Sequence, residues 1–214
     1  MIAIIDYGMG NLRSVQKAFE TVGCPAVVTR SPQVLRDASH VVLPGVGAFA
    51  DCMSNLEQFG LIQPIRAAIQ SGKPFLGICL GFQVLFSESE EFGVHKGLDV
   101  LSGRVLRFPW TSESSCGSPR GGPAGLKVPH MGWNQITIER RAPPFADLEN
   151  EASLYFVHSY YVVPAEPSLI ATTTTYGLSF ASSIWRDNIV ACQFHPEKSQ
   201  SVGLRIVKNF GAWQ

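Results

Sequence analysis

Hydrophobic residues in the first half of the chain alternate between short apolar runs and periodic, helix-like segments. The runs are typical of buried strands, and the periodic segments place apolar residues on one face at helical spacing. Strand, helix, strand repeats with short links favour a parallel sheet covered on both faces. The predicted strands are 2–5, 26–28, 41–43 and 75–78, and the predicted helices are 11–22, one beginning at 32, 49–59 and 61–70.

The second half of the chain has a different pattern. Its apolar runs follow one another with few helical segments between them, so some strands must pair antiparallel. A final helix is predicted from Ser201 to about Phe210. The pattern as a whole predicts an α/β fold in a single domain, 1–214, with a mixed, largely parallel sheet between helices and antiparallel additions in the second half. The predicted strands there are 100–108, 135–139, 154–163, 170–175, 181–185 and 189–194.

One segment fits neither half. Residues 111–125 are rich in Ser, Gly and Pro and carry almost no apolar side chains. This composition is typical of an irregular connection. We predict a long, mobile surface loop there rather than a domain boundary.

Composition and charge narrow the class of protein. Hydrophobic residues make up 45% of the chain and charged residues 16%, which favours a globular domain over a disordered one. Lys+Arg and Asp+Glu both count 17, so there is no electrostatic case for nucleic acid or an anionic membrane as the main partner. The apolar run after Met1 lacks a basic flank and is too short for a signal peptide or a membrane span. We therefore expect a cytoplasmic protein.

The cysteines agree with a reducing compartment. An odd number in a chain of this size does not suggest a disulfide framework. No C-x-x-C pair is present, and the ligand-like gap between Cys192 and His195 has no second pair to accompany it. We expect neither a metal site nor a cofactor. The five cysteines are Cys24, Cys52, Cys79, Cys116 and Cys192.

The strongest chemical signal surrounds Cys79. The sequence Gly77-Ile78-Cys79-Leu80-Gly81 follows an apolar strand and precedes a helical pattern that extends to Phe86. This is a nucleophile elbow with cysteine in the nucleophile position, where glycines avoid clashes with the strand and helix. The N-terminus of the following helix would stabilise the thiolate, and the Leu80 amide would face an oxyanion. The alternative is a small, buried cysteine at a tight junction.

His195-Pro196-Glu197 supplies what a nucleophilic thiol requires. His195 would accept the thiol proton and later protonate the leaving group, while Glu197 would hold the imidazole in place. Pro196 fixes one backbone angle between them. Taken separately, His195 could be a strand-end histidine and Glu197 a solvated carboxylate. The combination predicts a Cys79, His195 and Glu197 triad.

A glycine-rich turn, Pro44-Gly45-Val46-Gly47, follows the third predicted strand. By the logic of parallel sheets it lies at the same carboxyl edge as Cys79. The flanking glycines allow the Val46 peptide two orientations at low cost, and a backbone N–H there would complete an oxyanion hole. The alternative is an ordinary turn.

In this order, the glycine turn, the cysteine elbow and the H-P-E segment resemble the triad-type (class I) glutamine amidotransferases. Four further segments are similar to the glutaminase subunits of imidazole glycerol phosphate synthases within that family. Together the resemblance covers nearly the whole chain. The segments are 7–12 (YGMGNL), 127–134 (KVPHMGWN), 155–160 (YFVHSY) and 193–199 (QFHPEKS).

The resemblance implies a flavodoxin-like fold and a reaction. L-Glutamine would be hydrolysed to L-glutamate and ammonia without a cofactor. The ammonia would pass to a (β/α)8-barrel cyclase on a separate chain, which forms imidazole glycerol phosphate in histidine biosynthesis, so the working unit would be a heterodimer.

The resemblance also implies roles for particular residues. The oxyanion hole would comprise Val46, Gly47 and Leu80. Substrate binding would involve Gly45, Gln83, His158 and Ser159. For Gln83 the alternative is a polar residue on an exposed helix face, and for the segment around His158 and Ser159 it is the partner interface. The partner interface would contain Asn11, His130, Met131, Trp133 and Lys198; for Met131 and Trp133 the alternative is burial in the chain's own core.

Three other functions stay open at this point. The ammonia could serve another synthase, such as the one that makes pyridoxal phosphate, against which only the 7–12 and 127–134 segments argue. A stand-alone cysteine hydrolase or protease would use Cys79 and His195 but leaves Gln83 without a role. A non-catalytic interaction subunit would leave an intact triad unexplained.

Overall fold

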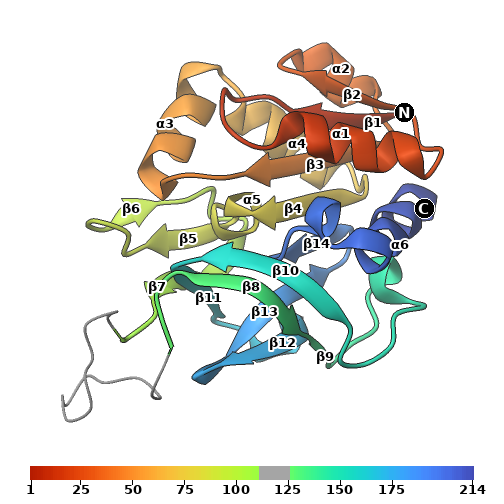
Figure 1. Ribbon diagram of the computed structural model, residues 1–214. Coiled ribbons are helices and arrows are strands. Elements are labelled where there is room, and N and C mark those ends of the chain that lie inside the picture. Colours follow the sequence, from red (N-terminus) through yellow and green to blue (C-terminus); the bar gives the residue numbers. More distant parts are fainter. Residues whose placement is uncertain (111–125) are drawn as a thin grey trace, which may run out of the picture.

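The computed structural model describes residues 1–110 and 126–214 (Figure 1). The predicted loop at 111–125 and Cys116 lie outside these described residues. Five neighbouring parallel strands form one half of the main sheet. In spatial order they are β2 (Ala26–Thr29), β1 (Ile2–Ile5), β3 (His40–Gly45), β4 (Phe75–Cys79) and β14 (Ile189–Cys192).

The other half of the sheet is mostly antiparallel, which confirms the predicted mixed architecture. From β14 the order continues through β13 (Leu178–Arg186), β11 (Tyr160–Pro164) and β7 (Leu101–Arg107). Beyond β7, β5 (Phe86–Ser89) runs parallel to it and β6 (His95–Lys96) pairs antiparallel with β5. To the side, β12 (Ile170–Tyr176) pairs with β13 and with β9 (Thr137–Ile138).

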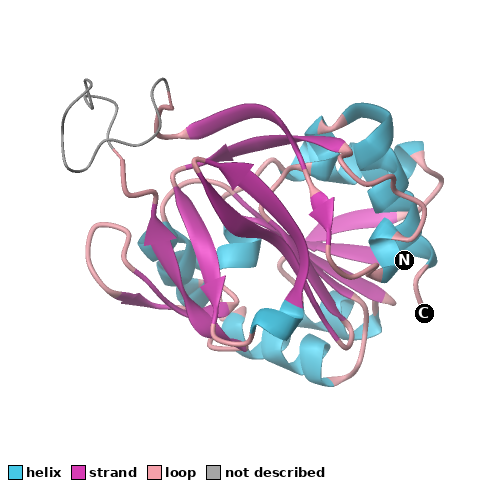
Figure 2. Cartoon of the chain, turned by 90° about the horizontal axis from the view of Figure 1, so that it is seen from below, coloured by secondary structure: helices cyan, strands magenta, loops and turns pink. Residues whose placement is uncertain are grey.

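Helices cover both faces of the parallel strands, and Figure 2 shows the strands in the middle of the molecule with helices around them. One face carries α2 (Pro32–Asp37), α3 (Phe49–Gln58) and α4 (Ile62–Gln70), and the other carries α1 (Leu12–Thr21) and α6 (Gln200–Ala212). Successive residues of β1 bury against opposite faces, so the strand is apolar throughout.

A separate two-stranded ribbon, β8 (His130–Gln135) and β10 (Ser153–His158), packs on the side of α6 (Figure 1). The strand predicted at 154–163 is therefore wrong as a single element, because it divides at Ser159 into β10 and β11. Phe156 buries in the cluster with α6, whereas Val162 buries in the cluster on the other face of the sheet. At Ser159 the chain thus passes from one sheet to the other.

Two further predictions were wrong in extent. The helix after Cys79, α5 (Leu80–Gln83), has a single turn, because Phe86 leaves it to begin β5 and pairs with Leu101. The strand predicted at 135–139 is divided between β8 and β9. Among the described residues, three short 3-10 helices each begin with a proline: η1 (Pro143–Phe145), η2 (Pro167–Leu169) and η3 (Pro196–Lys198). Within the described ranges, no helix has both the length and the apolar character needed to cross a membrane.

Candidate active site

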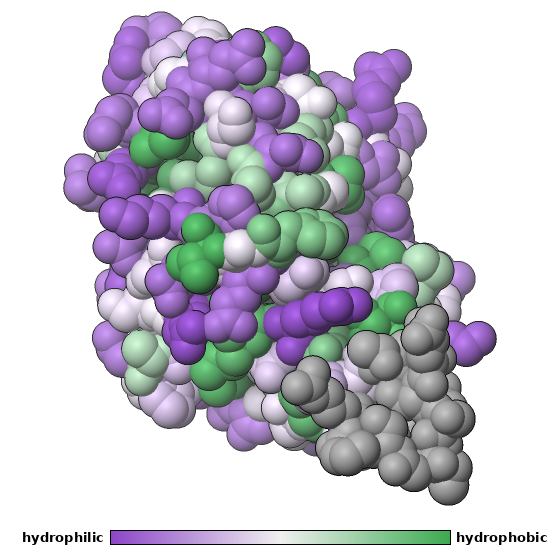
Figure 3. Space-filling model, turned by 90° about the vertical axis from the view of Figure 1, so that its left-hand side faces the viewer, coloured by the Kyte–Doolittle hydropathy of each residue, from purple (hydrophilic) through white to green (hydrophobic). Residues whose placement is uncertain are grey.

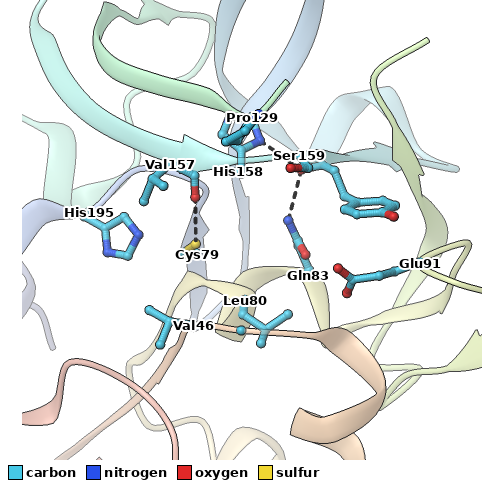
Figure 4. Close-up of a pocket in the computed structure, with 12 residues that line it drawn as sticks. Val46, Cys79, Leu80, Gln83, Glu91, Pro129, Val157, His158, Ser159 and His195 are labelled. Atoms are coloured by element: carbon cyan, nitrogen blue, oxygen red, sulfur yellow. Dashed lines mark hydrogen bonds between the residues drawn. The ribbon is translucent and has the colours of Figure 1, made fainter. Parts of the chain in front are cut away.

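A cavity of about 300 Å³ opens at the carboxyl ends of β3 and β4 (Figure 4). Its walls come from the turn after β3, the junction after β4, the β10–β11 junction and the segment after β14. Figure 3 views the edge of the molecule where the parallel strands end, and hydrophobic and hydrophilic groups are interspersed on it. Cys79 and His195 both line the cavity, so the structure brings the predicted nucleophile and base together.

Cys79 occupies a strained junction between β4 and α5. Its φ is 55° and its ψ is −107°, in a region that a residue with a side chain rarely adopts. Gly81 allows α5 to lie close to the neighbouring strand β3, since a Cβ there would be 1.8 Å from the Leu43 carbonyl oxygen. Close packing of this helix against a strand requires glycine at the position, as the elbow motif predicts. Because α5 is a single turn, however, its dipole is a weak source of stabilisation for a thiolate.

His195 and Glu197 form a buried pair. The Nδ1 atom of His195 lies 2.8 Å from Oε1 of Glu197, and the two side chains are 1% and 2% exposed. A hydrogen bond from Nδ1 leaves Nε2 as the atom that can accept a proton. Burial alone lowers the pKa of His195, but Cys79 and Glu197 outweigh burial and raise that pKa to about 10. The imidazole is therefore a stronger base than a free histidine side chain, as removal of a thiol proton requires.

The thiol and the imidazole share no hydrogen bond. The Cys79 thiol faces the Val157 carbonyl oxygen at 3.9 Å, and within residues 1–110 and 126–214 the Nε2 atom of His195 has no hydrogen-bond partner. Figure 4 shows the ring beside Cys79. Catalytic hydrogen bonds often form fully only when substrate is bound.

Two buried glutamines connect the cavity wall to the sulfur. Nε2 of Gln83 donates to the Tyr160 carbonyl oxygen at 3.0 Å and to Oε1 of Gln193 at 2.9 Å. Nε2 of Gln193 in turn donates to Sγ of Cys79 at 3.6 Å. Gln83 is only 6% exposed, so it is not on a solvated helix face. The sequence predicted a role for Gln83 but none for Gln193, although Gln193 lies just before the H-P-E segment.

Glu91 is a second residue of the cavity for which the sequence predicted no role. It is the one acidic side chain among the described residues that line the cavity, and its Oε2 accepts a hydrogen bond from the Phe49 amide at 2.6 Å. The amide anchors the carboxylate at the cavity mouth. Nothing in the local sequence distinguishes Glu91 from Glu88 or Glu90, so only the fold could identify it.

His158 lines the cavity and forms a hydrogen-bonded pair with His130. Nδ1 of His158 donates to the Tyr160 carbonyl at 2.8 Å, and its Nε2 lies 2.8 Å from Nδ1 of His130. Asn134 donates to Nε2 of His130 at 3.2 Å. Burial lowers the pKa of His130 to about 4 and that of His158 to about 3, so both rings are neutral at pH 7. Ser159, the next residue, also lines the cavity.

The glycine turn contributes Val46 and Gly47 to the cavity, and Leu80 lies there too. Gly47 has φ +97°, which few residues other than glycine adopt. Gly45, in contrast, is not among the residues that line the cavity and is enclosed at the end of β3, where a Cβ would lie 2.6 Å from the Tyr7 hydroxyl. Gly45 therefore has a packing role at the end of β3, and its contact with substrate stays a prediction.

The predicted partner residues separate into two groups. Met131 and Trp133 are 62% and 48% exposed, so their burial in the chain's own core is excluded. Lys198 lies on the same side of the ribbon, with Nζ 5.8 Å from the Tyr155 ring centre. The prediction for His130 was wrong, because alternation along β8 turns its side chain inward, where it is 3% exposed.

Asn11 immediately precedes α1 and is half-buried, without a side-chain cap of that helix. It does not line the cavity. Within the described ranges, no group of three or more His, Cys, Asp or Glu side chains is arranged to hold a metal ion.

Comparisons with known proteins agree with this geometry. The family described as "Glutamine amidotransferase class-I" matches residues 3–212. The chain is 61% identical to the imidazole glycerol phosphate synthase subunit HisH of Geobacter sulfurreducens, over 98% of this chain and 97% of that protein. It is 50% identical to the protein of the same name from Aquifex aeolicus, over 97% of this chain and 94% of the relative.

Solved structures show the same fold at low sequence identity. One described as a glutamine amidotransferase superposes with a TM-score of 0.69 at 17% identity, covering 100% of both chains. The structure of PurLQS from Thermotoga maritima gives a TM-score of 0.68 at 18% identity, covering 98% of this chain and 94% of that one.

Proposed function

Because the chain belongs to the class-I glutamine amidotransferase family, we propose that it hydrolyses L-glutamine to L-glutamate and ammonia and delivers the ammonia to a cyclase subunit. The single observation that carries the chemistry is the buried His195–Glu197 pair at the same cavity as the strained Cys79. High identity to subunits of imidazole glycerol phosphate synthase, over nearly the full length, supports the role in histidine biosynthesis.

In the first half of the reaction, Nε2 of His195 takes the Cys79 proton and the thiolate attacks the side-chain amide carbon of glutamine. The carbonyl oxygen becomes an oxyanion, which the amide N–H of Leu80 and an N–H of the Val46–Gly47 turn stabilise. His195 then gives its proton to the leaving nitrogen. Ammonia departs and a γ-glutamyl thioester on Cys79 remains.

In the second half, His195 removes a proton from water, which attacks the thioester. Collapse of the tetrahedral intermediate releases glutamate, and the proton returns to the sulfur. Glu197 holds the imidazole through Nδ1 in both halves and stabilises its charged form.

The cavity also has groups for the rest of the substrate. The Glu91 carboxylate is suited to the α-ammonium group of glutamine. Oε1 of Gln83 accepts no hydrogen bond from the described residues and is available to substrate, because both bonds that its amide makes use Nε2. These two side chains and the Ser159 region bind the polar end of the substrate.

The exposed apolar pair on β8 supports a partner surface. Met131 and Trp133 project from the ribbon whose other strand, β10, leads directly into the cavity wall at Val157 and His158. Aromatic residues and Met are enriched in the cores of interfaces. We assign this face to the cyclase subunit of a heterodimer, acting in the cytoplasm.

The experiment measures glutamate formation from glutamine by the purified chain, alone and with the cyclase and its nucleotide substrate. We expect turnover with the cyclase, and its loss by several orders of magnitude in Cys79→Ala. Cys24→Ala, at a cysteine outside the cavity, is the matched control and should retain activity. Glutamate formation that persists in Cys79→Ala would contradict the mechanism, and activity on amides or peptides other than glutamine would favour a stand-alone hydrolase.

A further inference from the structure

The two buried glutamines form a directed chain of hydrogen bonds that ends on the nucleophile. The direction follows from one atom, the Tyr160 carbonyl oxygen, which can only accept. The Gln83 atom that faces it at 3.0 Å must therefore be the Nε2 donor. The same Nε2 lies 2.9 Å from the Gln193 side chain, so the Gln193 atom there must be the acceptor Oε1.

This assignment determines which end of Gln193 faces Cys79. With Oε1 used by Gln83, the Nε2 donor is the atom 3.6 Å from Sγ. The other orientation would place two donors against each other in a site where Gln193 is completely buried. The choice between amide oxygen and nitrogen thus rests on the Tyr160 carbonyl rather than on the Gln193 contacts alone.

Gln193 is also held by its own backbone. Its amide N donates to the Ser182 carbonyl at 2.8 Å, which continues the pairing of the chain with β13 beyond the end of β14. His195 follows two residues later. The side chains that face the sulfur as donor and as base are therefore carried by one short, backbone-anchored segment.

We propose that Gln193 is a positioning residue for the nucleophile. Its N–H holds the Cys79 sulfur and donates more strongly once the thiol has lost its proton to His195, because hydrogen bonds to a charged acceptor are stronger than those to a neutral one. Its oxygen fixes the Gln83 amide, so that Oε1 of Gln83 stays available to substrate. This inference deepens the proposed glutaminase function and rests on it for the identity of the substrate.

Other titratable groups near the sulfur also have to be kept constant in a test. The groups that interact electrostatically with Cys79 are His195, which is paired with Glu197, Tyr7 from the segment after β1, and Cys192 at the end of β14. Replacing Gln193 by Met changes none of these charges and nearly conserves the side-chain volume. A change in thiol reactivity would therefore report the lost N–H.

The test measures alkylation of Cys79 by iodoacetamide in the full chain as a function of pH, with the modified residue identified by mass spectrometry. In Gln193→Met we expect the midpoint of the pH–rate profile to rise by about one unit, a tenfold lower rate at a fixed pH below the midpoint. Gln58→Met, at an exposed glutamine of α3, is the matched control and should keep the parent profile. An unchanged midpoint in a folded Gln193→Met chain would overturn the proposal.

A second readout separates a role at the sulfur from one through Gln83. With the cyclase present, we expect Gln193→Met to lower kcat about tenfold and to leave KM within about twofold, since the interaction is strongest with the charged sulfur. A raised KM with unchanged kcat would overturn the role at the nucleophile. Because alkylation involves no glutamine, its result stands even if the proposed substrate is wrong.

If Gln193→Met does not fold, the parent chain supplies the decisive measurement. The side-chain amide proton resonance of Gln193 should shift with pH at the same midpoint as the alkylation of Cys79. A resonance that does not move across that range would overturn the proposal.

Discussion

Oε1 of Glu197 lies 2.8 Å from Nδ1 of His195, and both side chains are almost completely shielded from solvent. A carboxylate in this position selects the tautomer in which Nε2 faces the cavity, and it stabilises the imidazolium. The second carboxylate oxygen, Oε2, has no hydrogen-bond partner within the described ranges. Among the described residues, the Glu197 carboxylate therefore hydrogen-bonds only to His195. Its negative charge is compensated mainly when His195 is protonated.

Glu197→Gln should reduce catalysis without preventing substrate binding. The amide can still contact Nδ1 but no longer stabilises a positive charge, so kcat should fall by roughly 10²–10⁴-fold with little change in KM. Steady-state glutaminase kinetics with the cyclase present would test this. Glu149→Gln, at an exposed carboxylate, should behave as the parent chain; a similar loss there, or none in Glu197→Gln, would contradict the assignment.

The raised pKa of His195 predicts a loss of stability at alkaline pH. Its folded value is about 10, against about 6.5 in an unfolded chain, so the folded state binds more protons between these limits. The stabilisation is complete below about pH 6.5 and is lost as pH rises towards 10. Urea unfolding at pH 7 and pH 9.5 should show a smaller decrease in the free energy of unfolding for His195→Gln than for the parent; an equal decrease would contradict the pairing.

The His130–His158 pair predicts the opposite dependence of stability on pH. The pKa values of His130 and His158 are lowered to about 4 and about 3, so the unfolded chain binds more protons than the folded chain as pH falls below 6.5. Stability should be retained above that pH and decrease towards pH 4, by up to about 1.4 kcal/mol per pH unit for each histidine. His158→Gln should reduce this slope in urea titrations at pH 7.5 and 5; an unchanged slope would show that the ring is not held neutral.

Trp133→Ala should weaken cyclase binding more than it affects folding. The side chain is 48% exposed, so its removal leaves no core cavity and should lower Tm by less than about 2 °C. As an exposed aromatic at an interface it should cost at least roughly tenfold in the dissociation constant. Val163→Ala, at a 41% exposed residue of β11, is the control. Normal cyclase binding by a folded Trp133→Ala chain would show that this face is not part of the interface.

The glycine turn suggests control of the oxyanion hole. If the Val46 peptide presents its carbonyl to the site, one donor is missing, which costs roughly 10²–10³-fold in rate. We expect the isolated chain to be nearly inactive, and the cyclase with its nucleotide to raise kcat far more than they lower KM. A thiol-reactive probe should already modify Cys79 in the free chain. Free-chain turnover equal to that of the complex would contradict the gating, and an unreactive Cys79 would instead indicate a misaligned Cys79–His195 pair.

Local sequence patterns predicted the parts of this site that local structure determines. The elbow at Cys79 could be identified because a strand, a glycine-framed turn and a helix follow one another within a few residues. The same apolar pattern overestimated the length of the helix, because an apolar residue at position 86 fits the buried face of a helix as well as a buried strand. The backbone pairing of Phe86 with Leu101, which is distant in the sequence, is what places Phe86 in a strand.

Residues whose roles depend on long-range register could not be predicted. His158 meets His130 because β10 and β8 pair with these two residues directly opposite each other, which the sequence does not specify. Gln193 reaches both Gln83 and Cys79 because β14 lies next to β4. The family resemblance assigned roles to His130 and His158 but none to Gln193, and the contacts of all three residues follow from the pairing of the strands.

The central claim is that Cys79 is the nucleophile of a glutamine-specific site, and covalent labelling tests it most directly. The chain, with the cyclase present, would be treated with a diazoketone analogue of glutamine, digested and mapped by mass spectrometry, with excess glutamine as competitor. We predict a single modified residue, Cys79, protected by glutamine and absent from His195→Gln, while Cys24, Cys52, Cys116 and Cys192 stay unmodified. Labelling mainly at another cysteine, or labelling of Cys79 that glutamine does not prevent, would contradict the account.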